Sequence, residues 1–268
     1  MQRNIWFLFI LLLVACQSDQ NQHTSDSNIE MNAPKIIYPK MLAEGMKAHD
    51  SKNKWSDMRT LEYTLTTGDK NERHIIDLRN RKVRIIHDEY MLGFDGKDVW
   101  ITPDRAAFGE GSPRFYHNLY FYFFAMPFVL SDPGIKYKVL ADRTLNEKQY
   151  ACLRIRFQDH VGDAPEDEYI ALFNPETHRM EYLLYTVTYY EGKPSRQYHA
   201  LHYNEWQEAN GIIVPKTMTR MEYADGMIGE IKYVRTFSDV EISADVPEND
   251  LFEKPAGAEI APLLENEE

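Results

Sequence analysis

Residues 60–66 (TLEYTLT) alternate apolar and polar side chains, with Leu61, Tyr63 and Leu65 at every second position. Successive side chains of a β-strand point to opposite faces of the sheet, so this period predicts a strand with one buried and one solvent-facing side. The same period of two occurs in residues 152–157 (CLRIRF), which predicts a second strand with one solvent-exposed face. Alternation of this kind is typical of antiparallel sheets that pack one face on a core.

Turn signals divide the rest of the chain into strand–turn–strand units. Asp-Gly and Asn-Gly pairs favour the tight turns of β-hairpins, and they occur at residues 95–96, 210–211 and 225–226. Residues 180–190 (MEYLLYTVTYY) are apolar or aromatic on both faces, which predicts a central strand. Strands are therefore expected from residue 60 to about residue 242, with one interruption.

The interruption is the aromatic stretch of residues 115–130 (FYHNLYFYFFAMPFVL). An apolar segment with proline inside it is more typical of a buried or interfacial element than of a membrane span. It is either a helix that closes the core of a curved sheet or a surface that also lines a ligand pocket. The candidate ligand-binding residues from this stretch and the central strand are His117, Tyr120, Phe121, Phe124, Phe128, Tyr182 and Leu184.

The N-terminus predicts export and lipidation. Residues 5–15 are an unbroken apolar run behind a short start with one positive charge. A membrane-spanning helix needs about 20 apolar residues, so the run fits a signal peptide better than a span. It ends in Leu13-Val14-Ala15-Cys16, which resembles the lipobox of bacterial lipoproteins. We therefore expect residues 1–15 to be a signal peptide and Cys16 to carry the lipid anchor.

The segment after the cysteine reads as a tether. Residues 16–33 are rich in Gln, Asn, Ser and Asp and cannot bury a core. Because Gln17 rather than aspartate follows the cysteine, sorting to the outer membrane is favoured, with the domain facing either the periplasm or the outside. The first partner expected is thus a membrane of the cell envelope, reached through the N-terminal lipid.

Residues 34–262 read as one β-rich domain, followed by an acidic tail at 263–268. Within the domain, residues 39–50 (PKMLAEGMKAHD) predict a short helix with Pro39 at its start. The net charge of −12, with no basic stripe, argues against nucleic acid or anionic lipid as the main partner. Besides Cys16 the chain has only Cys152, so no intramolecular disulfide can form once Cys16 is acylated.

Motifs for catalysis or metal binding are absent from the sequence, which has no H-E-x-x-H, C-x-x-C, G-x-S-x-G or P-loop pattern. His199 and His202 are three apart, which on a strand places them on opposite faces. The acidic residues within 159–168 could hold Ca²⁺, but a solvated loop fits their spacing better. Cys152 shares a strand face with Arg154 and Arg156, which could lower the pKa of its thiol, but a lone strand cysteine without a histidine placed beside it is more often inert. We predict no cofactor, no metal site and no enzymatic activity.

Several stretches resemble an uncharacterised family of Gram-negative lipoproteins that carry a domain of unknown function. They are Lys47-Ala48-His49 with Trp55, Phe94-Asp95-Gly96 with Trp100, residues 122–128 (YFFAMPF) before Ser131-Asp132-Pro133-Gly134, Val161-Gly162 with Asp167-Glu168-Tyr169, Tyr185-Thr186-Val187-Thr188-Tyr189, Gly211-Ile212 with Pro215, and Leu251-Phe252 with Pro255. The chain departs from the family pattern at Asp50-Ser51, where relatives tend to have two glycines. The family is in turn similar to the lipoprotein-carrier and lipoprotein-receptor superfamily. This resemblance implies a half-barrel whose concave face holds acyl chains.

Together these features predict a mainly β fold: a curved antiparallel half-barrel that wraps a short helical, aromatic plug, with an N-terminal helix. The expected function is that of an anchored envelope lipoprotein that binds an apolar or amphipathic ligand, such as an acyl chain. The alternative is a structural lipoprotein that binds envelope proteins through an edge of its sheet. An envelope hydrolase is the third interpretation.

Overall fold

The computed structural model describes residues 37–158 and 162–263. The predicted signal peptide, the tether, Cys16 and all but the first residue of the acidic tail therefore lie outside the described residues. The described residues from Tyr38 onward form one compact unit. In the described part of the chain, no helix has both the length and the apolar character needed to cross a membrane.

A single sheet of 13 strands dominates the fold, and every neighbouring pair is antiparallel. The strands are β1 Thr60–Thr67, β2 Lys70–Asp77, β3 Val83–Ile86, β4 Met91–Phe94, β5 Val99–Thr102, β6 Ile135–Leu145, β7 Lys148–Phe157, β8 Glu168–Phe173, β9 Met180–Tyr185, β10 His199–Ala209, β11 Ile212–Ala224, β12 Met227–Ser243 and β13 Glu259–Ala261. The helical elements are α1 Lys40–His49, α2 Pro113–Tyr116 and α3 Leu119–Phe124, with short 3₁₀ turns η1 Trp55–Asp57, η2 Ala106–Phe108, η3 Phe128–Ser131 and η4 Asn249–Phe252.

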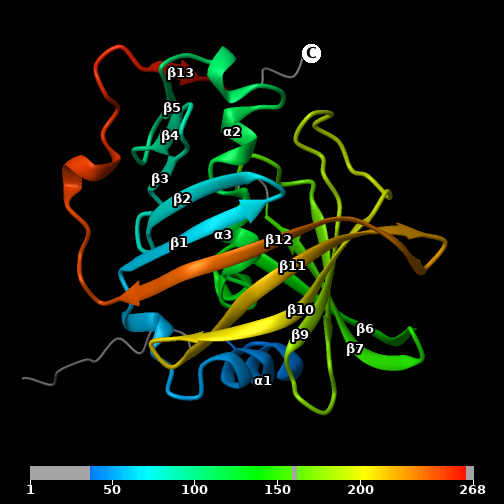
Figure 1. Cartoon of the computed structure of the whole chain (residues 1–268). Helices are drawn as coiled ribbons and strands as arrows, with labels where there is room; N and C mark the ends of the chain where they lie inside the picture. The colour runs from blue at the N-terminus through cyan, green and yellow to red at the C-terminus, as the bar shows by residue number, and fades with distance from the viewer. Residues whose placement is uncertain (1–36, 159–161, 264–268) are drawn as a thin grey trace, which may run out of the picture. The chain divides into compact units, whose positions relative to one another are not determined.

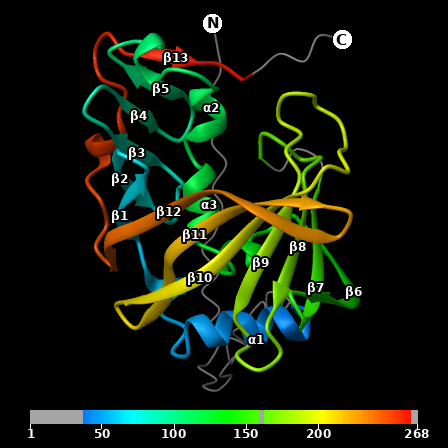
Figure 2. The same ribbon diagram turned by 45° about the vertical axis from the view of Figure 1, so that its right-hand side comes forward.

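The strand order explains why the sheet curves without closing. Strands β1 to β5 form one meander and β6 to β12 another, and the second returns to pair β12 with β1. The order runs from β13 at one edge, through β5 and β1, to β6 at the other edge, and these two edges do not pair. Figures 1 and 2 show the sheet curving around α3. The predicted antiparallel half-barrel is therefore confirmed.

Local sequence accounts for the strands and their turns. In β1 the residues Leu61, Tyr63 and Leu65 are buried and their neighbours are partly exposed, as the period of two predicted. Asn210 and Asp225 adopt positive φ angles of 50° and 51°, each followed by a glycine at positive φ. These left-handed pairs are the geometry of the tight hairpin turn, so the predicted hairpins β10–β11 and β11–β12 are confirmed.

The concave face of the sheet carries the main core. Phe124 of α3 stacks on Tyr63 of β1 at 4.9 Å between ring centroids and meets Phe237 of β12 at 5.0 Å. The Tyr203 hydroxyl of β10 donates a hydrogen bond to the Phe123 carbonyl at 2.9 Å. The aromatic stretch thus fills the hollow of the sheet as a plug, broken into α2, α3 and η3 rather than folded as one helix.

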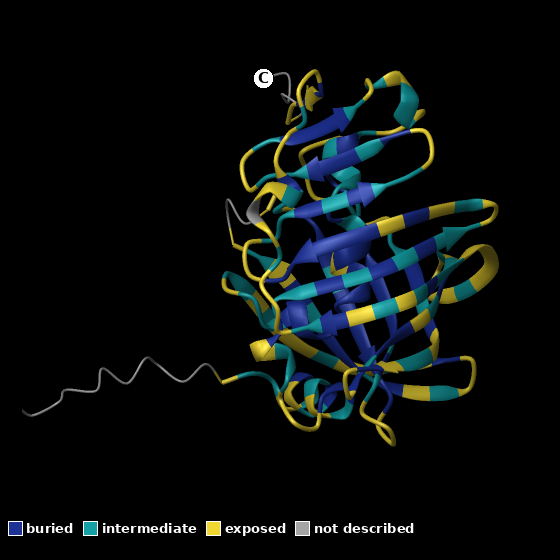
Figure 3. Ribbon diagram, turned by 60° about the vertical axis from the view of Figure 1, so that its left-hand side comes forward, coloured by how far each residue is buried: buried dark blue, intermediate teal, exposed yellow. Residues whose placement is uncertain are grey.

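A second, smaller apolar cluster lies on the opposite face of β7 to β10. It contains Cys152, which is fully buried, together with Tyr182 and Leu184. The sequence predicted solvent on the Cys152 face of this strand, and that prediction is wrong at this position. The reason is that side chains from β11 and β12, including Tyr223 and Ile228, pack over this face. Figure 3 shows that buried residues are concentrated in the strands and exposed residues mainly in the turns and loops.

Two further elements bear on the predictions. Helix α1 confirms the helix expected at 39–50, and Gly45 lets it approach β8 so closely that a Cβ there would lie 2.6 Å from the Phe173 ring. The predicted central strand at 180–190 ends at Tyr185. Beyond it, the carboxylate of Asp167 accepts hydrogen bonds from the backbone N–H and the hydroxyl of Thr188. At Thr188 the hydrogen-bond partner is therefore a side chain and not the backbone of a neighbouring strand.

Candidate ligand-binding site

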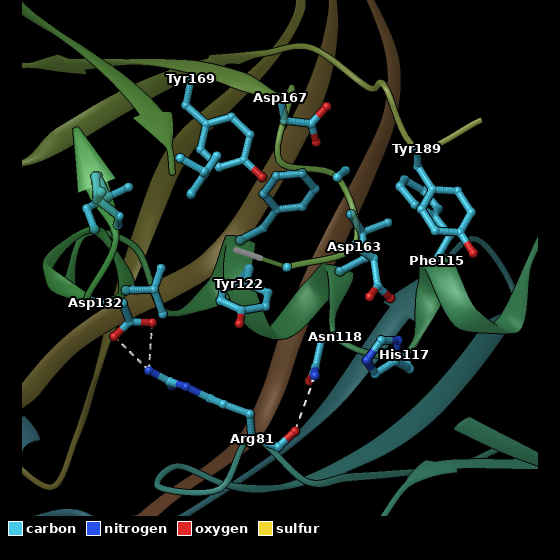
Figure 4. Close-up of a pocket in the computed structure, with 18 of the residues that line it drawn as sticks. Arg81, Phe115, His117, Asn118, Tyr122, Asp132, Asp163, Asp167, Tyr169 and Tyr189 are labelled. Carbon is cyan, nitrogen blue, oxygen red and sulfur yellow. Dashed lines mark hydrogen bonds and ion pairs between the residues drawn. The ribbon is translucent and has the colours of Figure 1, made fainter. Parts of the chain in front are cut away.

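Two pockets flank the helical plug on the concave side of the sheet. The first, pocket 1, has a volume of about 330 Å³ and lies between α2–α3, η3 and the strands β6 to β8. Figure 4 shows the side chains that converge on it. Its lining residues are Arg81, Phe94, Arg114, Phe115, His117, Asn118, Leu119, Tyr122, Phe123, Met126, Val129, Leu130, Asp132, Pro133, Ile135, Phe157, Gly162, Asp163, Ala164, Asp167, Tyr169 and Tyr189.

The wall of pocket 1 is mainly apolar because one face of the plug turns away from the core toward it. Phe123 and Met126 are buried, whereas Tyr122 on the same wall remains 37% exposed. Across the pocket, Phe157 and Tyr169 from β7 and β8 meet edge to face with ring centroids 5.3 Å apart. A concave, aromatic wall of this kind is typical of sites for apolar ligands.

The charged side chains of pocket 1 neutralise one another at its rim. Nη2 of Arg81 lies 2.8 Å from both carboxylate oxygens of Asp132. Arg114 holds Asp163 through two bonds, Nε to Oδ2 at 2.6 Å and Nη2 to Oδ1 at 3.0 Å. Such paired contacts between guanidinium and carboxylate groups are strong and directional. They connect the plug and the β2–β3 turn to the loops that border β6 and β8.

Two other polar groups of pocket 1 have shifted pKa values. Burial lowers the pKa of His117 to about 4, so the imidazole is neutral at pH 7 and its Nδ1–H donates to the Arg114 carbonyl. Burial raises the pKa of Asp167 to about 6, although hydrogen bonds from Thr188 oppose the rise. In the described part of the chain Asp167 has no ion-pair partner, so it is the one uncompensated carboxyl of pocket 1.

Pocket 2, of about 510 Å³, lies on the other side of the plug. Phe115 and Leu119 line both pockets and form the wall between them. Tyr120 of α3 and Tyr185 of β9 face pocket 2, and so do several cationic side chains. Its lining residues are Lys70, Phe108, Glu110, Gly111, Ser112, Phe115, Tyr116, Leu119, Tyr120, Tyr185, Val187, Tyr190, His199, Arg220, Lys232 and Tyr233.

A buried carboxylate lies beside pocket 2. Glu72 of β2 accepts hydrogen bonds from the hydroxyls of Tyr90 and Tyr116, and its Oε1 lies 3.1 Å from Nζ of Lys70. Burial would raise the pKa of Glu72, but contacts with His74, Tyr116 and Tyr90 more than offset it and hold the pKa well below its usual range. Glu72 therefore stays charged and compensates Lys70.

The structure separates the predicted ligand-binding residues into three groups: those that line a pocket, those in the main core and those on the far face of the sheet. His117 lines pocket 1 and Tyr120 lines pocket 2. The second group, in the main core, lines neither pocket and comprises Phe121, Phe124 and Phe128. The third group, Tyr182 and Leu184, lies in the second cluster on the far face of β9, because strand alternation turns Leu183 and Tyr185 toward the plug instead.

Sequence reasoning missed the groups that pair around pocket 1. Arg81, Arg114 and Asp132 carry no local pattern that joins them, since each partner lies about 50 residues away in the chain. Asp163 was assigned to a solvated acidic loop, and it instead binds Arg114. Tyr169 was not singled out as a site residue, although it follows that loop directly.

The groups considered for metal or nucleophile chemistry are dispersed. The described residues contain no group of three or more His, Cys, Asp or Glu side chains arranged to hold a metal ion. In the acidic loop, Asp167 binds Thr188 and Glu168 binds Arg156. Burial raises the pKa of the Cys152 thiol, which keeps it protonated. His199 and His202 lie on different faces of β10: His199 lines pocket 2, whereas the ring of His202 stacks on Tyr182 on the far face.

Comparison with known proteins identifies one family. A family model described as "Family of unknown function (DUF6503)" matches residues 104–241, just over half of the chain. This confirms the resemblance to a family whose function is not known. Comparison with curated proteins gives no match.

Solved structures with a similar backbone trace share little sequence identity with this chain. A LolA superfamily protein from Nitrosomonas europaea is 12% identical, with 80% of this chain and 96% of that chain covered and a TM-score of 0.48. A DUF1329 family protein from Desulfovibrio piger is 9% identical, with 73% and 88% covered and a TM-score of 0.42. Similarity at this level carries no information about a ligand.

Proposed function

The chain belongs to DUF6503, a family of unknown function, and we propose that it binds an apolar or amphipathic ligand, such as an acyl chain, in pocket 1. The observation that carries this proposal is the contrast between the wall and the rim of the pocket. The wall is aromatic and aliphatic, while the two arginines at the rim are each paired with an aspartate. The apolar part of a ligand that entered would therefore exchange water for apolar contacts. The arginines that it passes at the rim are already neutralised by their aspartates.

The size of pocket 1 suits part of an acyl chain. Its volume of about 330 Å³ lies near the lower end of the range of about 300–1,000 Å³ for small-molecule sites. Burial of about ten CH₂ groups would gain about 8 kcal/mol at about 0.8 kcal/mol each. Association costs consume part of this gain, which leaves affinity in the micromolar to millimolar range.

The proposal places this binding in the cell envelope. A lipid on Cys16 would hold the chain at a membrane. Residues 17–33 would act as a flexible tether that lets the domain move to some distance from that membrane. A domain tethered in this way can collect or deliver amphipathic molecules close to the bilayer. Outer-membrane anchoring is part of the proposal and follows from Gln17 after the lipidated cysteine.

A titration of the delipidated chain with a fluorescent fatty acid tests the proposal. We expect saturable binding that is lost in Ala164→Trp, because Ala164 lines pocket 1 from a surface loop and a tryptophan there would occupy it. Ala244→Trp is the matched control, since Ala244 is exposed in the loop after β12. Saturable binding that survives Ala164→Trp unchanged would place the ligand elsewhere, and a folded chain without binding would refute the proposal.

One observation favours a second candidate, a protein-binding role. Strand β12 pairs with β1 only as far as Arg235, so residues 227–234 have an open edge on that side. Met227 and Ile231 are 68% and 61% exposed there. An open, partly apolar edge can accept an extended segment of a partner as an added strand. A photo-crosslinker at position 231 should then label a protein in the native envelope more strongly than one at Val139 on edge strand β6, and equal labelling would argue against this role.

A further inference from the structure

Pocket 2 gathers positive charge in a chain whose net charge is −12. Lys70, Arg220 and Lys232 line it, whereas Glu110 is its one acidic lining residue. Arg235 adds to them, because its guanidinium lies 4.4 Å from the centre of the Tyr120 ring and 3.9 Å from that of Tyr233, and both rings line the pocket. The composition alone gives no sign of this local excess.

The register of the sheet places the two arginines side by side. Arg220 of β11 is opposite Tyr233 of β12, and Met218 is opposite Arg235. The arginines are therefore diagonal neighbours on the concave face, where such side chains lie about 7–8 Å apart at their backbones. Two like charges on neighbouring positions of one sheet face repel each other unless an anion lies near them.

The described residues supply no such anion. Arg220 binds Nδ1 of His199 and the Met221 carbonyl, both uncharged acceptors, since burial and Arg220 lower the pKa of His199. Neither Arg220 nor Arg235 has a carboxylate partner in the described part of the chain, and Nε of Arg235 is buried without a hydrogen-bond acceptor. Lys232 has only an exposed contact with Glu222 at 3.5 Å.

Pocket 1 has the opposite arrangement. Both of its arginines are held by aspartates, and a third carboxyl, Asp167, also lines it. One pocket thus offers apolar surface with its arginines neutralised, whereas the adjoining pocket has two arginines at its wall, Arg220 and Arg235, that have no carboxylate partner among the described residues. Because Phe115 and Leu119 line both, a single molecule with an apolar part and a head group can contact the two together.

We infer that pocket 2 binds the anionic head group, a carboxylate or a phosphate, of an amphiphile whose apolar part lies in pocket 1. Arg220 and Arg235 would hold its oxygens, and Lys232 would add to the attraction. The inference rests on the proposed function and narrows its ligand class to anionic amphiphiles. It also revises the interpretation of net charge, since an acidic chain can still present cations inside one pocket.

The test measures the affinity of the whole chain, in its Cys16→Ser form, for decanoate, decyl phosphate and decyl glucoside below their micelle-forming concentrations. We expect the two anionic probes to bind about tenfold more tightly than the neutral glucoside. Arg220→Gln should remove most of this preference by weakening the two anionic probes far more than the glucoside. Arg73→Gln is the matched control, because Arg73 is exposed, lines neither pocket and pairs with Glu62. A salt series on the unaltered chain gives a second measurement if a variant fails to fold: salt should weaken the binding of the two anionic probes and leave that of decyl glucoside nearly unchanged.

The outcomes are distinguishable. Equal affinity for decanoate and decyl glucoside would overturn the head-group assignment and leave the proposed function intact. Absence of binding for all three probes would overturn both. Inorganic phosphate is the last probe: it should compete with decyl phosphate only weakly, and binding as tight as that of decyl phosphate would mean a site for a free anion and would overturn the assignment.

Discussion

Arg81 and Asp132 join the β2–β3 turn to the end of the aromatic plug, with Nη2 of Arg81 2.8 Å from both carboxylate oxygens. Both side chains are about one-quarter to one-third exposed. Arg81→Gln should lower the free energy of unfolding by about 1–2 kcal/mol, because it leaves a half-buried carboxylate without its partner. Urea denaturation of the variant measures this cost.

The exposed ion pair between Arg73 and Glu62 supplies the control for that prediction. Arg73 is 58% exposed, so Arg73→Gln should cost less than about 0.5 kcal/mol. The double variant Arg81→Gln/Asp132→Asn should cost less than the sum of the two single changes, since each single change already breaks the pair. Strictly additive costs would show that the contact contributes nothing.

Phe124 and Tyr122 lie two positions apart in α3 but face different surroundings. Phe124 is fully buried between Tyr63 and Phe237, whereas Tyr122 lines pocket 1 and is 37% exposed. Phe124→Ala should destabilise the fold by about 3–5 kcal/mol. Tyr122→Ala should cost less than about 1 kcal/mol yet weaken uptake of a fluorescent fatty acid. Denaturation measures the stability of both variants, and titration measures their uptake of the fatty acid. A large loss of stability in Tyr122→Ala, or weakened uptake without loss of stability in Phe124→Ala, would contradict this placement of the plug.

Cys16 is expected to carry a diacylglycerol as the first residue of the mature chain. The intact mass of protein extracted from its native membrane should exceed that of residues 16–268 by the mass of the lipid. Cys16→Ser should abolish the excess and release the chain from the membrane fraction, because the anchoring free energy resides in the acyl chains. An unmodified thiol at this position in the native host would rule the anchor out.

The strands and hairpins could be predicted because their signals are local. The alternation around Leu61 and Tyr63 and the Asn210-Gly211 turn each act within a few residues. The end of β9 at Tyr185 could not be predicted from the apolar run 180–190, because the partner of Thr188 beyond it is Asp167, which lies in the loop before β8. The buried Cys152 was missed for a similar reason, since its cover comes from residues about 70 positions later.

The candidate site was predictable only as a region. The aromatic stretch predicted a plug or pocket wall, and it supplies His117 to pocket 1 and Tyr120 to pocket 2. Which of its side chains face the core and which face the pockets depends on breaks in the helix that the sequence pattern does not place. The cations of pocket 2 come from β2, β11 and β12, so only the register of the sheet brings them together.

Asp167 should make the stability of the fold depend on pH. Burial raises its pKa from the ordinary value of 3.8 to about 6, with Thr188 donating to Oδ1 at 2.7 and 2.8 Å. Between about pH 4 and pH 6 the folded chain therefore binds a proton that the unfolded chain does not, so this group makes the fold less stable as pH rises through that window. Its destabilising effect is complete above pH 6 and vanishes below pH 4.

Asp167→Asn separates this charge effect from the hydrogen bonds. Asparagine retains an Oδ1 that can accept from Thr188, but it has no charge to bury. The variant should be more stable than the unaltered chain at pH 7 by about 1–3 kcal/mol, since two pKa units correspond to about 2.7 kcal/mol before solvent screening. At pH 4 the two should unfold at the same denaturant concentration, and Asp245→Asn, at an exposed loop residue, should shift neither midpoint. A loss of stability of equal size at both pH values would mean that the Thr188 bonds, rather than the buried charge, decide the energetics of this side chain.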